Sequence, residues 1–130
     1  MIKTFHMAVH GSPLESQAHY SALRYAESLI GTAKLTQVFF FHEAAAVANR
    51  LTVPLSDEFV ARRAWREFAA ENSVRLCVCI ASSERRGVVD TASQHDHNLA
   101  SENVDHAFEI VGLGEFCDAL ATHDHFMSFV

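Results

Sequence analysis

The sequence predicts a three-layer α/β/α fold built on a mainly parallel sheet of about five strands. Two observations support this fold class. Strand-like runs alternate with helical patterns along the chain, and these runs are apolar almost throughout, as is typical of strands covered by helices on both faces. The 130 residues show no repeat or linker and match the size of one ordinary domain, so we expect residues 1–130 to form one domain.

The expected strands are short runs rich in apolar, β-branched and aromatic residues. The clearest is LTQVFFFH, at residues 35–42, whose near-continuous apolarity indicates burial on both faces. In chain order, the predicted strands cover residues 2–9, 35–42, 74–81, 107–113 and 124–130.

The expected helices lie between these strands. Apolar residues from Ala18 to Leu29 recur at helical spacing, and Gly31 is expected to end that helix. Ser56 is the expected N-cap of a second long helix, because acidic residues follow it in the first turn. In chain order, helical segments are predicted at residues 16–30, 43–51, 56–72, 86–93 and 114–123.

Composition limits the classes of function. The chain has 16 acidic and 10 basic residues and a formal charge of −6, which argues against binding nucleic acid by neutralising phosphates. No apolar run approaches the roughly 20 residues that a membrane-spanning helix needs. The N-terminal segment is too short and too polar for a secretion signal. We therefore expect a cytoplasmic protein with no membrane span, whose involvement with nucleic acid is at most indirect.

The three cysteines are Cys77, Cys79 and Cys117, and an odd number without an export signal argues against a disulfide framework. Cys77 and Cys79 stand two residues apart on one predicted strand, so their side chains share a face, with Cys77 deeper. Ligands of open parallel sheets bind beyond the carboxyl ends of the strands, and Cys79 lies near such an end.

Residue chemistry leaves two interpretations of Cys79 open. Arg85 and Arg86 follow the strand closely, and nearby guanidinium groups favour the reactive thiolate form of a cysteine. Free cysteines are, however, commonly small buried residues with no chemical role. On residue chemistry alone, this second interpretation is favoured, and Cys77 and Cys79 would simply pack in the core.

Metal and cofactor sites are not predicted. The chain has nine histidines and two HDH segments, at residues 95–97 and 123–125, but neither these nor CVC has the ligand spacing of a zinc site. GLGEF, at residues 112–116, lacks the spacing of a dinucleotide-binding loop, and the sequence contains no phosphate-binding loop or nucleophile elbow. We therefore expect no metal and no cofactor.

Several segments, taken together, resemble one known family. In this order and at similar spacing they resemble the DsrE/DsrF-like family, most closely its TusD branch, over nearly the whole chain. The family fold is a parallel α/β sandwich, which agrees with the fold class predicted above. The matching segments are VFFFHEAAAVANRLTVPLSDEF at residues 38–59, Arg63 to Trp65, LCVCIASSERRGVVD at 76–90, NLASEN at 98–103, GLGEF at 112–116, and Asp124 before the last strand.

The resemblance implies a sulfurtransferase subunit that acts in the 2-thiolation of the tRNA wobble uridine. Counting back from the RRG segment places the family's reactive cysteine at Cys79. Cys79 would accept sulfane sulfur, hold it as a persulfide and pass it on, while Arg85 and Arg86 would stabilise the anionic forms. Cys77 has no counterpart role in the family pattern.

The resemblance also implies partners. TusB-like and TusC-like chains would complete a heterohexamer, a TusA-like carrier would supply sulfur, and a TusE-like protein would accept it, so that tRNA is involved only indirectly. Three segments depart from the family pattern, and one of them is the histidine-rich QHDHNLASEN at residues 94–103, which would be a local elaboration. Only Gly11, Pro13 and Gln17 of the first loop match it, and SSERRG is more polar than the usual alanine-rich version. These departures bear on partner preference more than on the sulfur chemistry.

Two alternative functions remain open at this point. The chain could be a DsrE-like protein that carries sulfur in dissimilatory sulfur oxidation, where the carrier chemistry is similar and the partners differ. It could also be a non-catalytic assembly module of such a complex, in which Cys79 is idle.

Overall fold

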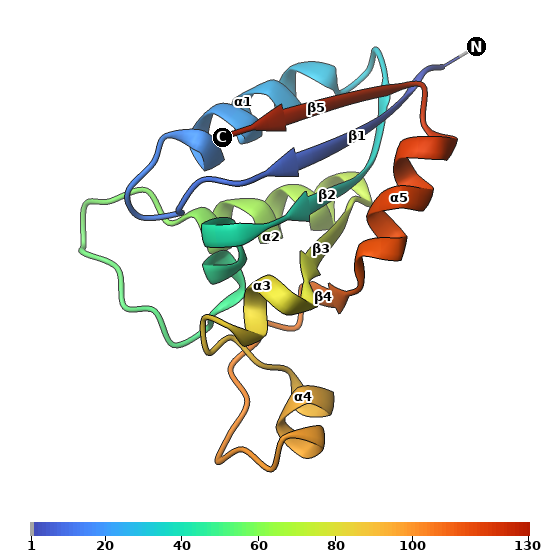
Figure 1. The fold of residues 1–130 in the computed structure, drawn as a ribbon. Coiled ribbons are helices and arrows are strands. Elements are labelled where there is room, and N and C mark those ends of the chain that lie inside the picture. Colours follow the sequence, from blue (N-terminus) through green and yellow to red (C-terminus); the bar gives the residue numbers. More distant parts are fainter. Residues whose placement is uncertain (1) are drawn as a thin grey trace.

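The computed structural model describes residues 2–130, and its centre is a five-stranded sheet in the order β4-β3-β2-β1-β5 (Figure 1). Every pair of neighbouring strands in this sheet is parallel. The predicted α/β fold class with a parallel sheet is therefore confirmed. The strands are β1 (Thr4–Val9), β2 (Lys34–Phe40), β3 (Arg75–Cys79), β4 (Phe108–Val111) and β5 (His125–Phe129).

Helices cover both faces of the sheet. The two long helices α1 and α2 lie on one face, and α5 lies on the other (Figure 1). The short helices α3 and α4 follow β3 at its carboxyl end. The helices are α1 (Ala18–Leu29), the 3₁₀ helix η1 (His42–Ala48), α2 (Ala61–Asn72), α3 (Ile80–Glu84), α4 (Thr91–Asp96) and α5 (Leu113–Thr122).

The alternation of side chains along each strand divides the core into two clusters of unequal size. Phe40 points to the side of α1 and α2, where it packs against Trp65 in the larger cluster. Phe39 points to the side of α5, where it packs with Cys77 in the smaller cluster. Because both faces are buried, β2 contains apolar residues at successive positions, as the sequence predicts.

A buried histidine joins the two long helices. The Nε1–H of Trp65 in α2 donates to Nδ1 of His19 in α1 at 3.1 Å, so the Nε2–H of His19 donates to the carbonyl oxygen of Gly11 at 2.9 Å. Burial lowers the pKa of His19 to about 4. This neutral imidazole therefore ties α1, α2 and the loop after β1 together.

Several predicted boundaries are wrong, each for a local reason. The second long helix begins at Ala61 instead of Ser56, because the Glu58 carboxylate accepts the N–H of Leu55 at 3.0 Å and closes a separate turn. The third strand ends at Cys79, where the chain enters α3 directly. The helix predicted at residues 86–93 begins only at Thr91, because the chain first turns at Gly87, which has a φ of +70°.

None of the helices between residues 2 and 130 has the length and apolarity that crossing a membrane requires.

Candidate functional site

A pocket of about 440 Å³ opens beyond the carboxyl ends of the central strands β2 and β3. This is the edge of a parallel sheet at which loops converge and ligands bind in related architectures. The pocket includes all three residues singled out from the sequence. Its lining is formed by Phe41, His42, Cys79, Ala81, Ser82, Arg85, Arg86 and Leu113.

Cys79 is the last residue of β3 and the residue before α3. Its register partner on β4 is Val111, the last residue of that strand, so Cys79 lies at the rim of the sheet. The thiol belongs to the small cluster on the α5 side, packed with Phe39 and Phe41, and the residue is 4% exposed. Cys79 is thus held by the core on one side and borders the pocket on the other.

The other two cysteines lie in different environments. Cys77 shares the face of Cys79, as its spacing predicts, but it lies one step deeper in the sheet and does not line the pocket. Burial raises the pKa of Cys77 to about 11, which disfavours a thiolate near neutral pH. Cys117 is exposed on α5 and also lies outside the pocket lining. Of the three thiols, only Cys79 borders the pocket.

The two arginines reach the pocket in different ways. Arg86 donates to the Glu43 carboxylate at 2.8 Å and to the carbonyl oxygen of Ser82 at 3.0 Å, and its Nε–H is buried without an acceptor. The same ion pair lowers the pKa of Glu43, mainly through its hydrogen bond with Arg86. Arg85 is exposed and has no carboxylate partner within the described residues. Arg86 is therefore fixed in place, whereas Arg85 is free to meet a ligand.

His42 is a pocket residue that the sequence did not single out. It directly follows Phe41 after β2, and its backbone has a φ of +49°, in the left-handed region that few non-glycine residues adopt. The backbone N–H of His42 donates to Oγ of Ser82 at 2.9 Å, which joins this turn to α3. The ring of His42 stacks on that of His10, with centroids 5.5 Å apart. The signal available in the sequence was its position at the end of a central strand.

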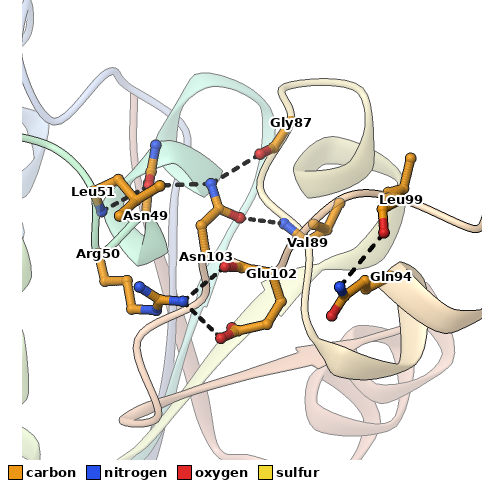
Figure 2. A network of polar contacts seen from close by, with 9 residues as sticks. All are labelled: Asn49, Arg50, Leu51, Gly87, Val89, Gln94, Leu99, Glu102 and Asn103. Atoms are coloured by element: carbon orange, nitrogen blue, oxygen red, sulfur yellow. Dashed lines mark hydrogen bonds and ion pairs between the residues drawn. The ribbon is translucent and has the colours of Figure 1, made fainter.

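The loop that follows Arg86 is fixed by Asn103 (Figure 2). Its side-chain oxygen accepts the N–H of Val89 at 2.8 Å, and its amide group donates to the carbonyl oxygen of Gly87 at 3.0 Å. The same amide group donates to Oδ1 of Asn49, after η1, at 3.1 Å. Asn103 therefore holds the RRG turn against the end of η1, a role that nothing in the sequence indicated.

The histidine-rich segments lie apart from the pocket lining. His97, after α4, approaches the Glu84 carboxylate at 3.2 Å, and His123, before β5, contacts the hydroxyl group of Thr36. Between residues 2 and 130 no three His, Cys, Asp or Glu side chains are grouped closely enough to hold a metal ion.

Comparisons with known proteins agree with the resemblance stated from the sequence. Sulfurtransferase TusD of Yersinia pestis (strain Pestoides F) and that of Yersinia pseudotuberculosis (serotype O:1b, strain IP 31758) are each 38% identical to this chain over 124 residues, which is 95% of either length. The crystal structure of the ychN protein from E. coli has a TM-score of 0.76, covers 99% of this chain and 100% of its own, and shares the fold at 19% identity. The DsrE/DsrF-like family model matches residues 3–129, so this chain belongs to the DsrE/DsrF-like family.

Proposed function

We propose that this chain is a sulfurtransferase subunit that relays persulfide sulfur through Cys79. The observation that carries the proposal is the meeting of Cys79, Arg85 and Arg86 in one pocket. The curated relatives that are 38% identical over 95% of the chain are sulfurtransferases by name, which supports the same chemical class here.

The chemistry requires one accessible thiol that reacts twice. The Cys79 thiolate attacks the outer sulfur of a donor persulfide, a sulfur–sulfur bond forms at Cys79, and the donor leaves as a thiolate. A second thiolate, on the acceptor protein, then attacks the outer sulfur of the Cys79 persulfide and releases Cys79. No net oxidation occurs, because a sulfane sulfur moves from one thiol to another. A pocket at the rim of the sheet, bordered by Cys79, suits both encounters.

The two arginines would stabilise the anionic sulfur at different stages. Arg86 is fixed by Glu43 and by α3, so it supplies a positive charge at a constant position in the lining of the Cys79 pocket. Arg85 lines the same pocket with an exposed side chain, so it is able to reach a persulfide that extends outward from Cys79. In this assignment neither arginine reacts, and both stabilise the thiolate and persulfide anions of Cys79.

The proposed place of the relay is the 2-thiolation of the tRNA wobble uridine. The partners proposed are TusB-like and TusC-like chains in a heterohexamer, with a TusA-like donor and a TusE-like acceptor. The formal charge of −6 fits a protein that hands sulfur to another protein and contacts tRNA only indirectly. We also propose that residues 1–130 act as one sulfur-relay domain and that the protein works in the cytoplasm.

The alternative functions are not favoured. The curated relatives carry the name of sulfurtransferase TusD, which does not favour a role in dissimilatory sulfur oxidation. An assembly module with an idle Cys79 would have no use for a pocket that gathers a thiol and two guanidinium groups.

Intact-protein mass spectrometry tests the proposal directly. The protein is incubated with a persulfidated TusA-like carrier, and wild type is compared with Cys79→Ser, Cys77→Ser and Cys117→Ser. Wild type, Cys77→Ser and Cys117→Ser should each gain the mass of one sulfur atom, and a reductant should remove it. Cys79→Ser should gain none.

The partner chains provide the decisive control. If no cysteine takes up sulfur when TusB-like and TusC-like chains are also present, the chain is an assembly module and the relay proposal is wrong. If Cys117→Ser alone fails to take up sulfur, the chemistry is a relay but the assignment to Cys79 is wrong.

A further inference from the structure

We propose that His42 is the proton acceptor that activates the Cys79 thiol. This inference deepens the proposed function, because it names the group that handles the proton of the reacting thiol. The observation that carries it is the position of His42 in the lining of the Cys79 pocket, at the carboxyl end of the neighbouring strand β2.

The pocket lining contains no other side chain suited to this task. A guanidinium group stays protonated in proteins, so Arg85 and Arg86 stabilise an anion but accept no proton. The hydroxyl group of Ser82 is a poor base, and it already accepts the N–H of His42. A neutral imidazole has one ring nitrogen with a free lone pair, so His42 is the lining residue whose side chain can accept a proton.

The surroundings of His42 hold its ring in place. On one side its ring stacks on His10, which follows β1 and which itself stacks on Phe41 at 5.3 Å between centroids. Burial, and then repulsion from His42, lowers the pKa of His10, which favours the neutral form of its ring. The other titratable groups near His42 are the neighbouring Glu43 and, across the pocket, Arg85, Arg86 and Cys79.

The left-handed backbone at His42 gives a second reason to assign it a role. A φ of +49° is costly for a residue with a Cβ atom, and such strain is concentrated at functional sites. Here the turn directs the chain from β2 into η1 while Ser82 holds its backbone N–H. An asparagine would adopt this conformation more easily, so the presence of histidine calls for a reason that concerns its ring.

The proposed step balances in atoms and electrons. Neutral His42 takes the proton of the Cys79 thiol, and the resulting thiolate attacks the outer sulfur of the donor persulfide R–S–SH. The new sulfur–sulfur bond forms at Cys79, the old one breaks, and the donor leaves as R–S⁻. Protonated His42 returns its proton to R–S⁻, which gives R–SH, a Cys79 persulfide and neutral His42 again.

The pH dependence of Cys79 alkylation tests this assignment without any sulfur donor. The protein is treated with iodoacetamide over a range of pH, and alkylation at Cys79 is quantified by peptide mass spectrometry. His42→Asn is the informative variant, because asparagine tolerates the left-handed backbone and accepts no proton near neutrality. His95→Asn, an exposed change on α4, is the matched control.

We expect His42→Asn to slow alkylation about 10-fold or more near pH 7, and to match wild type at alkaline pH, where thiols ionise without help. His95→Asn should follow the wild-type profile throughout. A His42→Asn profile that coincides with that of wild type would overturn the proposal, whether or not Cys79 carries sulfur. Conversely, if His42→Asn slows alkylation as expected but Cys79 takes up no sulfur, only the relay function is contradicted.

A measurement on wild type covers the case in which His42→Asn does not fold. The imidazole signal of His42 is followed by NMR through a pH titration, before and after Cys79 is alkylated. If His42 accepts the proton of the Cys79 thiol, alkylation of Cys79 shifts the midpoint of the His42 titration. An unchanged midpoint would contradict the assignment by itself.

Discussion

The apolar clusters on the two faces of the sheet differ in size and in the residues that they contain. The face under α1 and α2 carries the large apolar cluster, in which the buried polar groups of Trp65 and His19 are hydrogen-bonded. The face under α5 carries a small cluster with two thiols, and its buried His6 has no hydrogen-bond partner on either ring nitrogen. Stability and chemistry are therefore separated: the larger cluster, under α1 and α2, holds the fold together, and the smaller one, under α5, positions Cys79.

The largest expected effect comes from truncating a residue of the larger cluster. Trp65→Ala should lower the free energy of unfolding by about 3–5 kcal/mol, because it empties a fully buried site and removes the partner of His19. Phe116→Ala, on α5, should cost less than half as much, since Phe116 is only half-buried. Urea denaturation of both variants measures the two values. Equal losses would contradict the division between the faces.

The two buried histidines, one on each face of the sheet, make the stability of the fold depend on pH. Burial lowers the pKa of both His19 and His6 to about 4, and in His6 repulsion from His123 adds to the effect. The unfolded chain therefore binds protons that the folded chain excludes. The stability from these groups is complete above about pH 6.5 and is lost as the pH falls toward about 4, by about 3 kcal/mol for His19.

Replacing each histidine separates the two contributions. His6→Phe should reduce the loss of stability in acid without lowering stability at pH 7, because no hydrogen bond is removed. His19→Phe should also reduce the acid loss, but it should cost about 1–3 kcal/mol at pH 7, since it leaves the Trp65 N–H unpaired. Urea midpoints measured between pH 7 and pH 4.5 give both values. If His6→Phe also lowers the free energy of unfolding at pH 7, the His6 ring stabilises the fold through contacts other than hydrogen bonds.

Sequence reasoning was most successful where side chains alternate in and out of a strand. The shared face of Cys77 and Cys79, with Cys79 at the outer end, follows from their spacing and is confirmed. The sequence did not reveal the roles of His42 and Asn103. The backbone turn at His42 has no residue signature, and the partners of Asn103 lie up to 54 residues away in the chain. The strand order was likewise set by tertiary packing that no local pattern encodes.

An intermediate effect is expected at the turn that carries the two arginines. Asn103→Ala should lower the free energy of unfolding by about 1–3 kcal/mol, because it leaves the buried N–H of Val89 without its acceptor. Amide hydrogen exchange should increase at Val89, whose N–H loses its acceptor, before it increases in the strands of the sheet. Gln94→Ala is the control nearby, since the Gln94 side chain bonds only to Leu99 within the described residues, apart from the Asn103 contacts (Figure 2), and this hydrogen bond is long at 3.4 Å. The control should stay within about 0.5 kcal/mol of wild type.

The smallest effect is expected on the reactivity of Cys79, when the two pocket arginines are replaced one at a time. Arg85→Ala should slow alkylation of Cys79 only about threefold, because an exposed charge is screened by water and salt. Arg86→Ala should slow it more, since its guanidinium is fixed between Glu43 and the carbonyl oxygen of Ser82. Raising the salt concentration should reduce the Arg85 effect and leave most of the Arg86 effect. If the two effects are equal and equally sensitive to salt, both arginines act only through the general field of the pocket, and the fixed geometry of Arg86 has no role in thiolate formation.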